Sequence, residues 1–131
     1  MEYMLPTCED ILAVLKEVPA FSRVRFVMLY GSVAEGRADR ESDIDICIYF
    51  EGGEEDASRF RMDAMTALSS TPVDIRMFQQ LPLYVRVQVL KGKVVYCPDL
   101  TFLYDVAWNT IREYDDFRHR LDDYLGVKAI S

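Results

Sequence analysis

The chain has 131 residues, of which 50% are hydrophobic, and its formal net charge is −7 at pH 7. This acidic balance argues against a protein that binds a long nucleic acid, because such affinity comes largely from Lys and Arg that neutralise phosphates. The first ten residues lack the basic region and apolar run of a signal peptide, and no stretch approaches the roughly 18 apolar residues of a membrane span, so we expect a cytoplasmic protein without membrane contact.

The first part of the chain predicts a helix followed by a strand. Thr7 and Asp10 form a T-x-x-D capping box, and apolar residues then recur at helical spacing as far as Pro19. Residues 23–30 are rich in Val, Phe, Met and Leu, which indicates a strand. Gly31-Ser32 ends this strand, and a short helical turn is expected after it.

The rest of the chain alternates strands and helices. Residues 44–50 are apolar on both faces, which is typical of a central strand covered by helices. The further expected elements are a helix over 54–68, a strand over 73–78, a helix over 83–90, a strand over 93–97 and a long helix over 100–126. This pattern predicts an α/β (α+β) fold with a small mixed β-sheet covered by helices. We expect one domain over 1–131, in which about 99–126 form a C-terminal helical extension.

Two carboxylates lie at the start of the second predicted strand. Asp43 and Asp45 are two positions apart and therefore share one face of that strand. Carboxylates side by side repel each other unless a cation lies between them, and hard oxygen ligands suit Mg²⁺. At Gly31 and Ser32 the backbone can approach a phosphate closely, and a turn leading into a helix offers free N–H groups to an anion. These residues together indicate a metal and nucleotide site.

These motifs resemble those of a known family. Gly31-Ser32, followed eleven positions on by Ser42-Asp43-Ile44-Asp45, is similar to the G-S-x(n)-D-x-D signature of the DNA polymerase β-type nucleotidyltransferase superfamily. The forms GSVAEGR and SDIDI in a short chain most resemble its smallest branch, the minimal nucleotidyltransferase (MNT) family. Several members of that branch are antitoxins paired with HEPN-domain toxins. The resemblance implies a polymerase β-like nucleotidyltransferase fold.

The resemblance also implies roles for the site residues. Two Mg²⁺ ions would bind, one with the triphosphate of ATP and the other beside the attacking hydroxyl. Asp74 would be the third ligand and the base for the acceptor proton if its strand lies beside the second strand; the alternative is a strand acid that pairs with an arginine. The implied catalytic and metal-binding residues are Asp43, Asp45 and Asp74. The implied nucleotide-binding residues are Gly31, Ser32, Arg37 and Ser42.

Glu35 departs from the family pattern, because many relatives carry Arg there in the form G-S-x-A-R-G. An acid at the phosphate end of the site would repel a triphosphate. Either Glu35 points away, or Arg37 or Arg40 supplies the positive charge. Both arginines are equally compatible with solvent-exposed positions in a loop, where they would have no role in binding.

Three functions are compatible with this reading. The first is a Mg²⁺-dependent nucleotidyltransferase that moves AMP from ATP to a hydroxyl, which the family implies is a tyrosine of a cognate HEPN toxin. The second is an antitoxin that neutralises its toxin by docking alone. The third is a small-molecule nucleotidyltransferase resembling aminoglycoside-modifying enzymes, although those usually carry an added helical domain. Association between copies of the chain stays open.

The long last helix leaves its own question open. His119 is given no role, because a lone histidine on a charged helix is typically a surface residue. The aromatic residues form either core beneath the sheet or an exposed patch for a partner. They are Phe102, Tyr104, Trp108, Tyr114 and Tyr124. A separate apolar stripe at helical spacing comprises Leu100, Leu103, Ala107, Ile111, Tyr114, Leu121 and Leu125.

Overall fold

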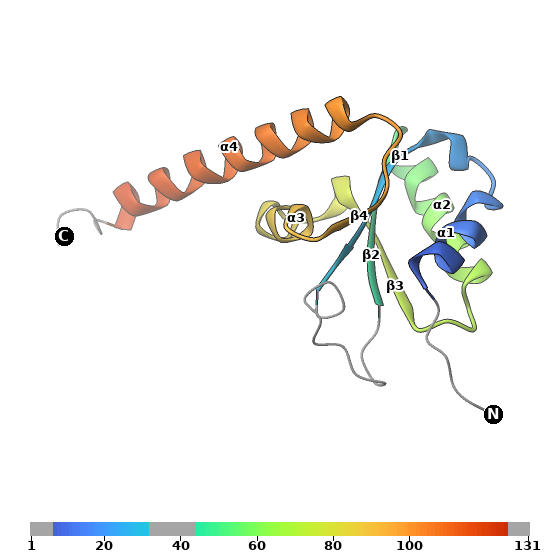
Figure 1. Cartoon of the computed structure of the whole chain (residues 1–131). Helices are drawn as coiled ribbons and strands as arrows, with labels where there is room; N and C mark the ends of the chain where they lie inside the picture. The colour runs from blue at the N-terminus through green and yellow to red at the C-terminus, as the bar shows by residue number, and fades with distance from the viewer. Residues whose placement is uncertain (1–6, 32–43, 126–131) are drawn as a thin grey trace.

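The computed structural model describes residues 7–31 and 44–125. Within these ranges the chain forms a four-stranded sheet flanked by helices (Figure 1). The strands are β1 (Val24–Tyr30), β2 (Ile44–Phe50), β3 (Val73–Met77) and β4 (Lys93–Tyr96). The helices are α1 (Cys8–Lys16), α2 (Glu54–Ala67), α3 (Leu83–Leu90) and α4 (Leu100–Leu125), with short 3-10 segments at Phe21–Arg23 and Phe78–Gln80. The helices and strands predicted within these ranges are present with slightly shifted ends, whereas the short helical turn expected after Gly31 lies outside them.

The sheet has the strand order β3-β2-β1-β4. Strand β1 runs antiparallel to β2 and to β4, whereas β2 and β3 are parallel. A parallel pair needs a crossover connection, and α2 lies between β2 and β3 in the chain. The predicted mixed sheet is therefore confirmed, and β2 is internal, as its apolar sequence indicated.

One face of the sheet is covered by α1 and α2. Ile46 of β2 is fully buried and belongs to a core cluster with Leu15 of α1 and Phe60 of α2. The predicted capping box begins α1: Asp10 donates its backbone N–H to Thr7 Oγ1 at 3.1 Å, and Thr7 donates its own to Asp10 Oδ2 at 3.0 Å. These two bonds satisfy N–H groups that an uncapped helix start leaves without partners.

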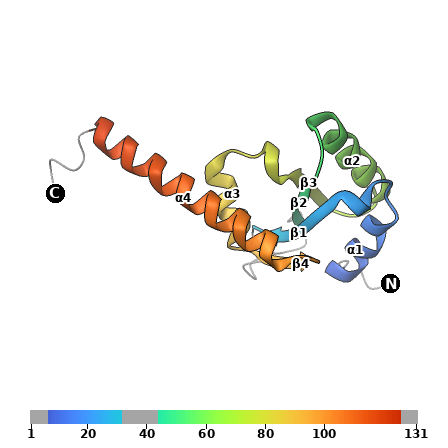
Figure 2. The same ribbon diagram turned by 90° about the horizontal axis from the view of Figure 1, so that it is seen from above.

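The opposite face is covered by α3 and the first turns of α4. Cys47 of β2 is buried there in a second cluster with Phe26, Phe78, Val89 and Leu103. Because strand side chains alternate, the neighbours Ile46 and Cys47 belong to different clusters. The view from above shows α1 and α2 on one side of the sheet and α3 and α4 on the other (Figure 2).

Arg25 of β1 attaches the start of α4 to the sheet. Its guanidinium lies 3.0 Å from Glu51 Oε2 and 3.6 Å from Asp99 Oδ2. The guanidinium carbon also lies 3.8 Å from the centre of the Phe102 ring. Asp99 Oδ1 accepts the backbone N–H of Phe102 at 3.2 Å, so Asp99 caps this helix.

Beyond this attachment α4 extends away from the sheet (Figure 1). Its buried residues are Leu103 and Thr110. The apolar stripe predicted along this helix is covered only in part, because Leu100, Ile111, Leu121 and Leu125 are exposed. Helical spacing shows which side chains share a face, but not whether another element covers it. Among the described helices, none combines the length and the apolar character that a membrane crossing requires.

The aromatic residues of α4 divide between the two readings that the sequence left open. Phe102 packs against the second core cluster, where its ring meets that of Tyr49 edge to face with centroids 4.9 Å apart. Tyr104, Trp108 and Tyr124 are instead exposed. The helix therefore contributes an aromatic residue to the core at its start and presents others to solvent farther along.

Candidate functional site

Strands β2 and β3 place two of the predicted carboxylates side by side. Asp45 of β2 is the register partner of Asp74 of β3. Because the strands are parallel and in register, both side chains project from the same face of the sheet. Cys47, two positions after Asp45, is buried under α3 and α4, so the carboxylates lie on that face. Asp74 was expected to join the site only if its strand lay beside the second strand, and the pairing of β2 with β3 meets this condition.

The remaining predicted site residues fall outside the described ranges. These are Ser32, Arg37, Ser42 and Asp43, together with Glu35 and Arg40. Residues 7–31 and 44–125 contain no group of three or more His, Cys, Asp or Glu side chains placed to hold a metal ion. They do supply two adjacent carboxylates, and the oxygen donors of these fit a hard cation such as Mg²⁺.

Gly31 lies against Asp45 at the end of β1. Its φ is +78°, in the left-handed region that other residues rarely adopt. A Cβ atom built on Gly31 would also collide with Oδ2 of Asp45. Tyr30, the preceding residue, is the register partner of Asp45. The glycine is thus required both by its backbone conformation and by its close approach to a carboxylate of the site.

Arg76 joins this group, although the sequence analysis did not name it. Its Nε donates to Asp74 Oδ2 at 3.1 Å. This hydrogen bond, with the attraction of the carboxylate, raises the pKa of Arg76 above its ordinary value. The pairing with an arginine that was the alternative for Asp74 therefore exists together with the pairing to Asp45. The alternating sequence Val-Asp-Ile-Arg-Met could have predicted it, because residues two apart share a strand face.

Tyr30 is a second residue of the site that sequence reasoning missed. Burial raises the pKa of its hydroxyl to about 12, and the neighbouring Cys47, Asp45 and Asp74 add to this shift while Arg76 opposes it. The hydroxyl therefore keeps its proton at neutral pH. The hydroxyl is therefore a potential hydrogen-bond donor close to the carboxylates. Its place beside Asp45 depends on the pairing of β1 with β2, which the sequence alone does not show.

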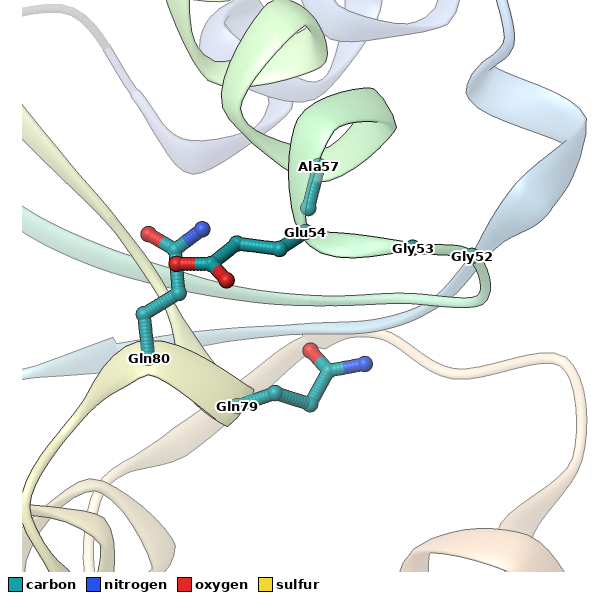
Figure 3. A pocket seen from close by; sticks show the side chains of 6 residues that line it. All are labelled: Gly52, Gly53, Glu54, Ala57, Gln79 and Gln80. Atoms are coloured by element: carbon teal, nitrogen blue, oxygen red, sulfur yellow. The ribbon is translucent and has the colours of Figure 1, made fainter.

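A pocket at the other end of β2 does not belong to this site. It is lined by Gly52, Gly53, Glu54, Ala57, Gln79 and Gln80 (Figure 3). Gln79 uses its amide to pair with the backbone of Phe50, donating to its carbonyl at 2.6 Å and accepting its N–H at 3.4 Å. The acid Glu54 at the wall disfavours phosphate groups. Gln79 therefore links the end of β2 to the 3-10 segment that follows β3.

Comparison with known proteins places the chain in a family. The family model described as "Polymerase beta, Nucleotidyltransferase" matches residues 9–101, which include Gly31, Asp45 and Asp74. A Methanocaldococcus jannaschii protein named "Putative protein adenylyltransferase MJ1547" is 31% identical over 80 residues, covering 60% of this chain and 61% of that protein. The chain therefore spans less than two thirds of the length of this relative.

Solved structures show the same fold. A crystal structure of a toxin–antitoxin with AMP-PNP superposes with a TM-score of 0.72 at 18% identity, covering 96% of this chain and 100% of that chain. A complex of tri-AMPylated Shewanella oneidensis HEPN toxin with MNT antitoxin gives a TM-score of 0.63 at 16% identity, covering 95% and 96%. The predicted polymerase β-like fold is confirmed. Because the family model matches more than half of its residues, this chain belongs to the Polymerase beta nucleotidyltransferase family.

Proposed function

We propose that this chain is a Mg²⁺-dependent nucleotidyltransferase that moves AMP from ATP to a tyrosine hydroxyl of a cognate HEPN toxin. The observation that carries the proposal is the in-register pairing of Asp45 and Asp74 beside Gly31, on the fold of this family. The nucleotide and the acceptor are supported by the solved relatives, of which one holds AMP-PNP and another contains an AMPylated HEPN toxin.

The proposed transfer is a displacement at phosphorus. The acceptor oxygen forms a bond to the α-phosphorus of ATP, the bond from that phosphorus to the bridging oxygen breaks, and pyrophosphate leaves. Asp74 accepts the proton of the hydroxyl. Asp43, Asp45 and Asp74 would hold Mg²⁺, which when bound neutralises phosphate charge and lowers the pKa of the acceptor hydroxyl.

The other residues bind and position. The backbone at Gly31 and Ser32 would hydrogen-bond the phosphates, with Arg37 and Ser42 completing the nucleotide-binding set. Arg76 is a positioning residue, because its bond to one oxygen of Asp74 fixes the orientation of that carboxylate.

We further propose that residues 1–131 act as one minimal nucleotidyltransferase domain, in which 99–126 form a C-terminal helical extension. The exposed aromatic side chains of α4 favour a second candidate, an antitoxin that acts by docking alone. The two candidates differ in whether the carboxylates are needed.

The test is the intact mass of a cognate HEPN-domain protein, sought in the neighbouring gene, after incubation with this protein, ATP and Mg²⁺. We expect a gain of whole AMP units. Asp45→Asn and Asp74→Asn should each abolish the gain, because an amide cannot replace a carboxylate as a cation ligand or base. Asp63→Asn, the same change at an exposed position of α2, is the matched control and should leave transfer intact.

Two results would count against catalysis. A stable complex without any mass gain would leave docking as the better account. A mass gain that both site variants retain would show that the transfer does not use these carboxylates. Removal of Mg²⁺ with EDTA should stop the transfer without dissociating the complex.

A further inference from the structure

The outer half of α4 carries an apolar stripe that, beyond its first residue, the rest of the described chain leaves exposed. The stripe consists of Tyr114, Phe117, Leu121 and Tyr124, spaced alternately three and four residues apart. This spacing places all four on one face of the helix. Phe117 is 49% exposed, Leu121 42% and Tyr124 86%. We call these four residues the outer stripe.

The outer stripe continues the face by which α4 packs onto the rest of the protein. Leu103 and Thr110, buried in the inner half, fall on the same heptad positions as Phe117 and Tyr124. Tyr114 is the last residue of this face with a recorded ring contact, to Tyr84 of α3, with centroids 6.4 Å apart. Figures 1 and 2 both show α4 running on past α3. A packing face thus extends beyond the element on which it packs.

The charges beside the outer stripe differ from those of the chain as a whole. Arg118 and Arg120 lie on opposite flanks of the stripe, about 80° around the helix from its centre. Neither arginine forms an ion pair with another described residue. Glu113 is the acid nearest the stripe, and it lies one to two helical turns before Arg118 and Arg120. The other acids of this half lie toward the back of the helix: Asp115, Asp116, Asp122 and Asp123.

This composition is typical of a protein-binding surface. Aromatic residues and Arg are enriched at interfaces and supply most of their binding energy. In a chain of net charge −7, two arginines beside an apolar stripe complement a partner surface whose apolar centre is rimmed by carboxylates.

The position of α4 relates the outer stripe to the catalytic residues. Leu103 of α4 and Cys47 of β2 belong to one cluster, and Cys47 is on the same strand face as Asp45. The helix therefore projects from the face of the sheet on which Asp45 and Asp74 lie. A protein bound along the outer half of α4 would therefore lie on the same side of the sheet as these carboxylates.

We propose that the outer stripe, with Arg118 and Arg120, is the surface that docks the acceptor protein. This inference rests on the proposed function, since the acceptor is the proposed HEPN toxin. Its contact surface is expected to be apolar with flanking Asp and Glu. Docking on α4 would raise the local concentration of the acceptor hydroxyl at the site and so contribute to substrate selection.

The test measures, by isothermal titration calorimetry, the dissociation constant of the complex between this chain and the same HEPN-domain protein. Phe117→Asp and Leu121→Asp should each weaken binding by about 30-fold or more, the usual scale of a hot-spot substitution. His119→Asp, the same new side chain on the opposite face of the helix, is the matched control and should bind like the original protein. Circular dichroism should show equal helix content for all three. Arg118→Glu with Arg120→Glu should also weaken binding and reduce its dependence on salt.

The outcomes separate docking from catalysis. Equal binding by the stripe variants and the original protein overturns the docking proposal even if AMP is transferred. Loss of binding in these variants upholds it even if the original protein transfers no AMP, in which case only the proposed activity fails. A dimer of this chain that the stripe variants abolish, with toxin binding unchanged, assigns the surface to a second copy and overturns the proposal. Absence of any complex with the original protein overturns it as well.

Discussion

Replacing Gly31 by Ala should damage the site more than the fold. The residue has a φ of +78°, and the left-handed conformation costs an L-residue about 1–2 kcal/mol. For a chain of this size that cost corresponds to a fall in melting temperature of about 4–8 °C. The new methyl group would in addition collide with Oδ2 of Asp45. Asp45 must then move, and a catalytic group misplaced by about 1 Å can cost 10²-fold in rate.

The assay combines thermal unfolding with the rate of AMP transfer. We expect Gly31→Ala to unfold at a lower temperature and to transfer AMP at least about 100-fold more slowly. Gly53→Ala is the matched control, because Gly53 has a φ of −71° and a Cβ built there meets nothing within 4 Å. As Gly53 is the N-cap of α2, its replacement should cost about 1 kcal/mol or less and leave transfer unchanged. A Gly31→Ala protein with unchanged melting temperature and full activity would refute this reasoning.

Two further predictions concern stability and thiol chemistry. Arg25→Ala removes two ion pairs and a ring contact at 3.8 Å, and it should lower the free energy of unfolding by about 1–2 kcal/mol in urea titrations. Arg23→Ala removes one more exposed ion pair and a longer ring contact, 5.2 Å from the Phe50 ring centre, and it should cost about 1 kcal/mol or less. Equal losses would contradict the role given to Arg25. Burial raises the pKa of the Cys47 thiol and shields it from reagents. Iodoacetamide at neutral pH should therefore label Cys8 and Cys97 in the folded protein and reach Cys47 only after unfolding, as measured by intact mass. Rapid labelling of all three thiols in the folded state would contradict the burial of Cys47.

Much of the fold could be predicted from local sequence pattern. The capping box at Thr7 specified where α1 begins, because its hydrogen bonds join residues three positions apart. The apolar run of β2 indicated a strand covered on both faces, and the structure has it inside the sheet. Gly31 was expected to let the backbone approach a phosphate, which stays a prediction; what the structure shows is its close approach to Asp45.

The candidate site was predictable only in part. That Asp43 and Asp45 share a strand face follows from the period of the strand. That Asp74 lies beside Asp45 does not, because the two residues belong to different strands, and their register depends on how α2 packs when it connects those strands. Arg76 was missed because its importance depends on the same register, although its spacing from Asp74 was visible in the sequence.

The sequence by itself determined the elements, their faces and the family motifs, because these depend on residues near one another along the chain. Strand order, the meeting of Gly31, Asp45 and Asp74, and the exposure of α4 depend on contacts between distant segments. The last case shows the difference most clearly. Helical spacing groups Leu103 and Phe117 on one face of α4, but only the tertiary structure shows that the sheet and α3 cover the first and leave the second exposed, because the helix is longer than the surface on which it packs.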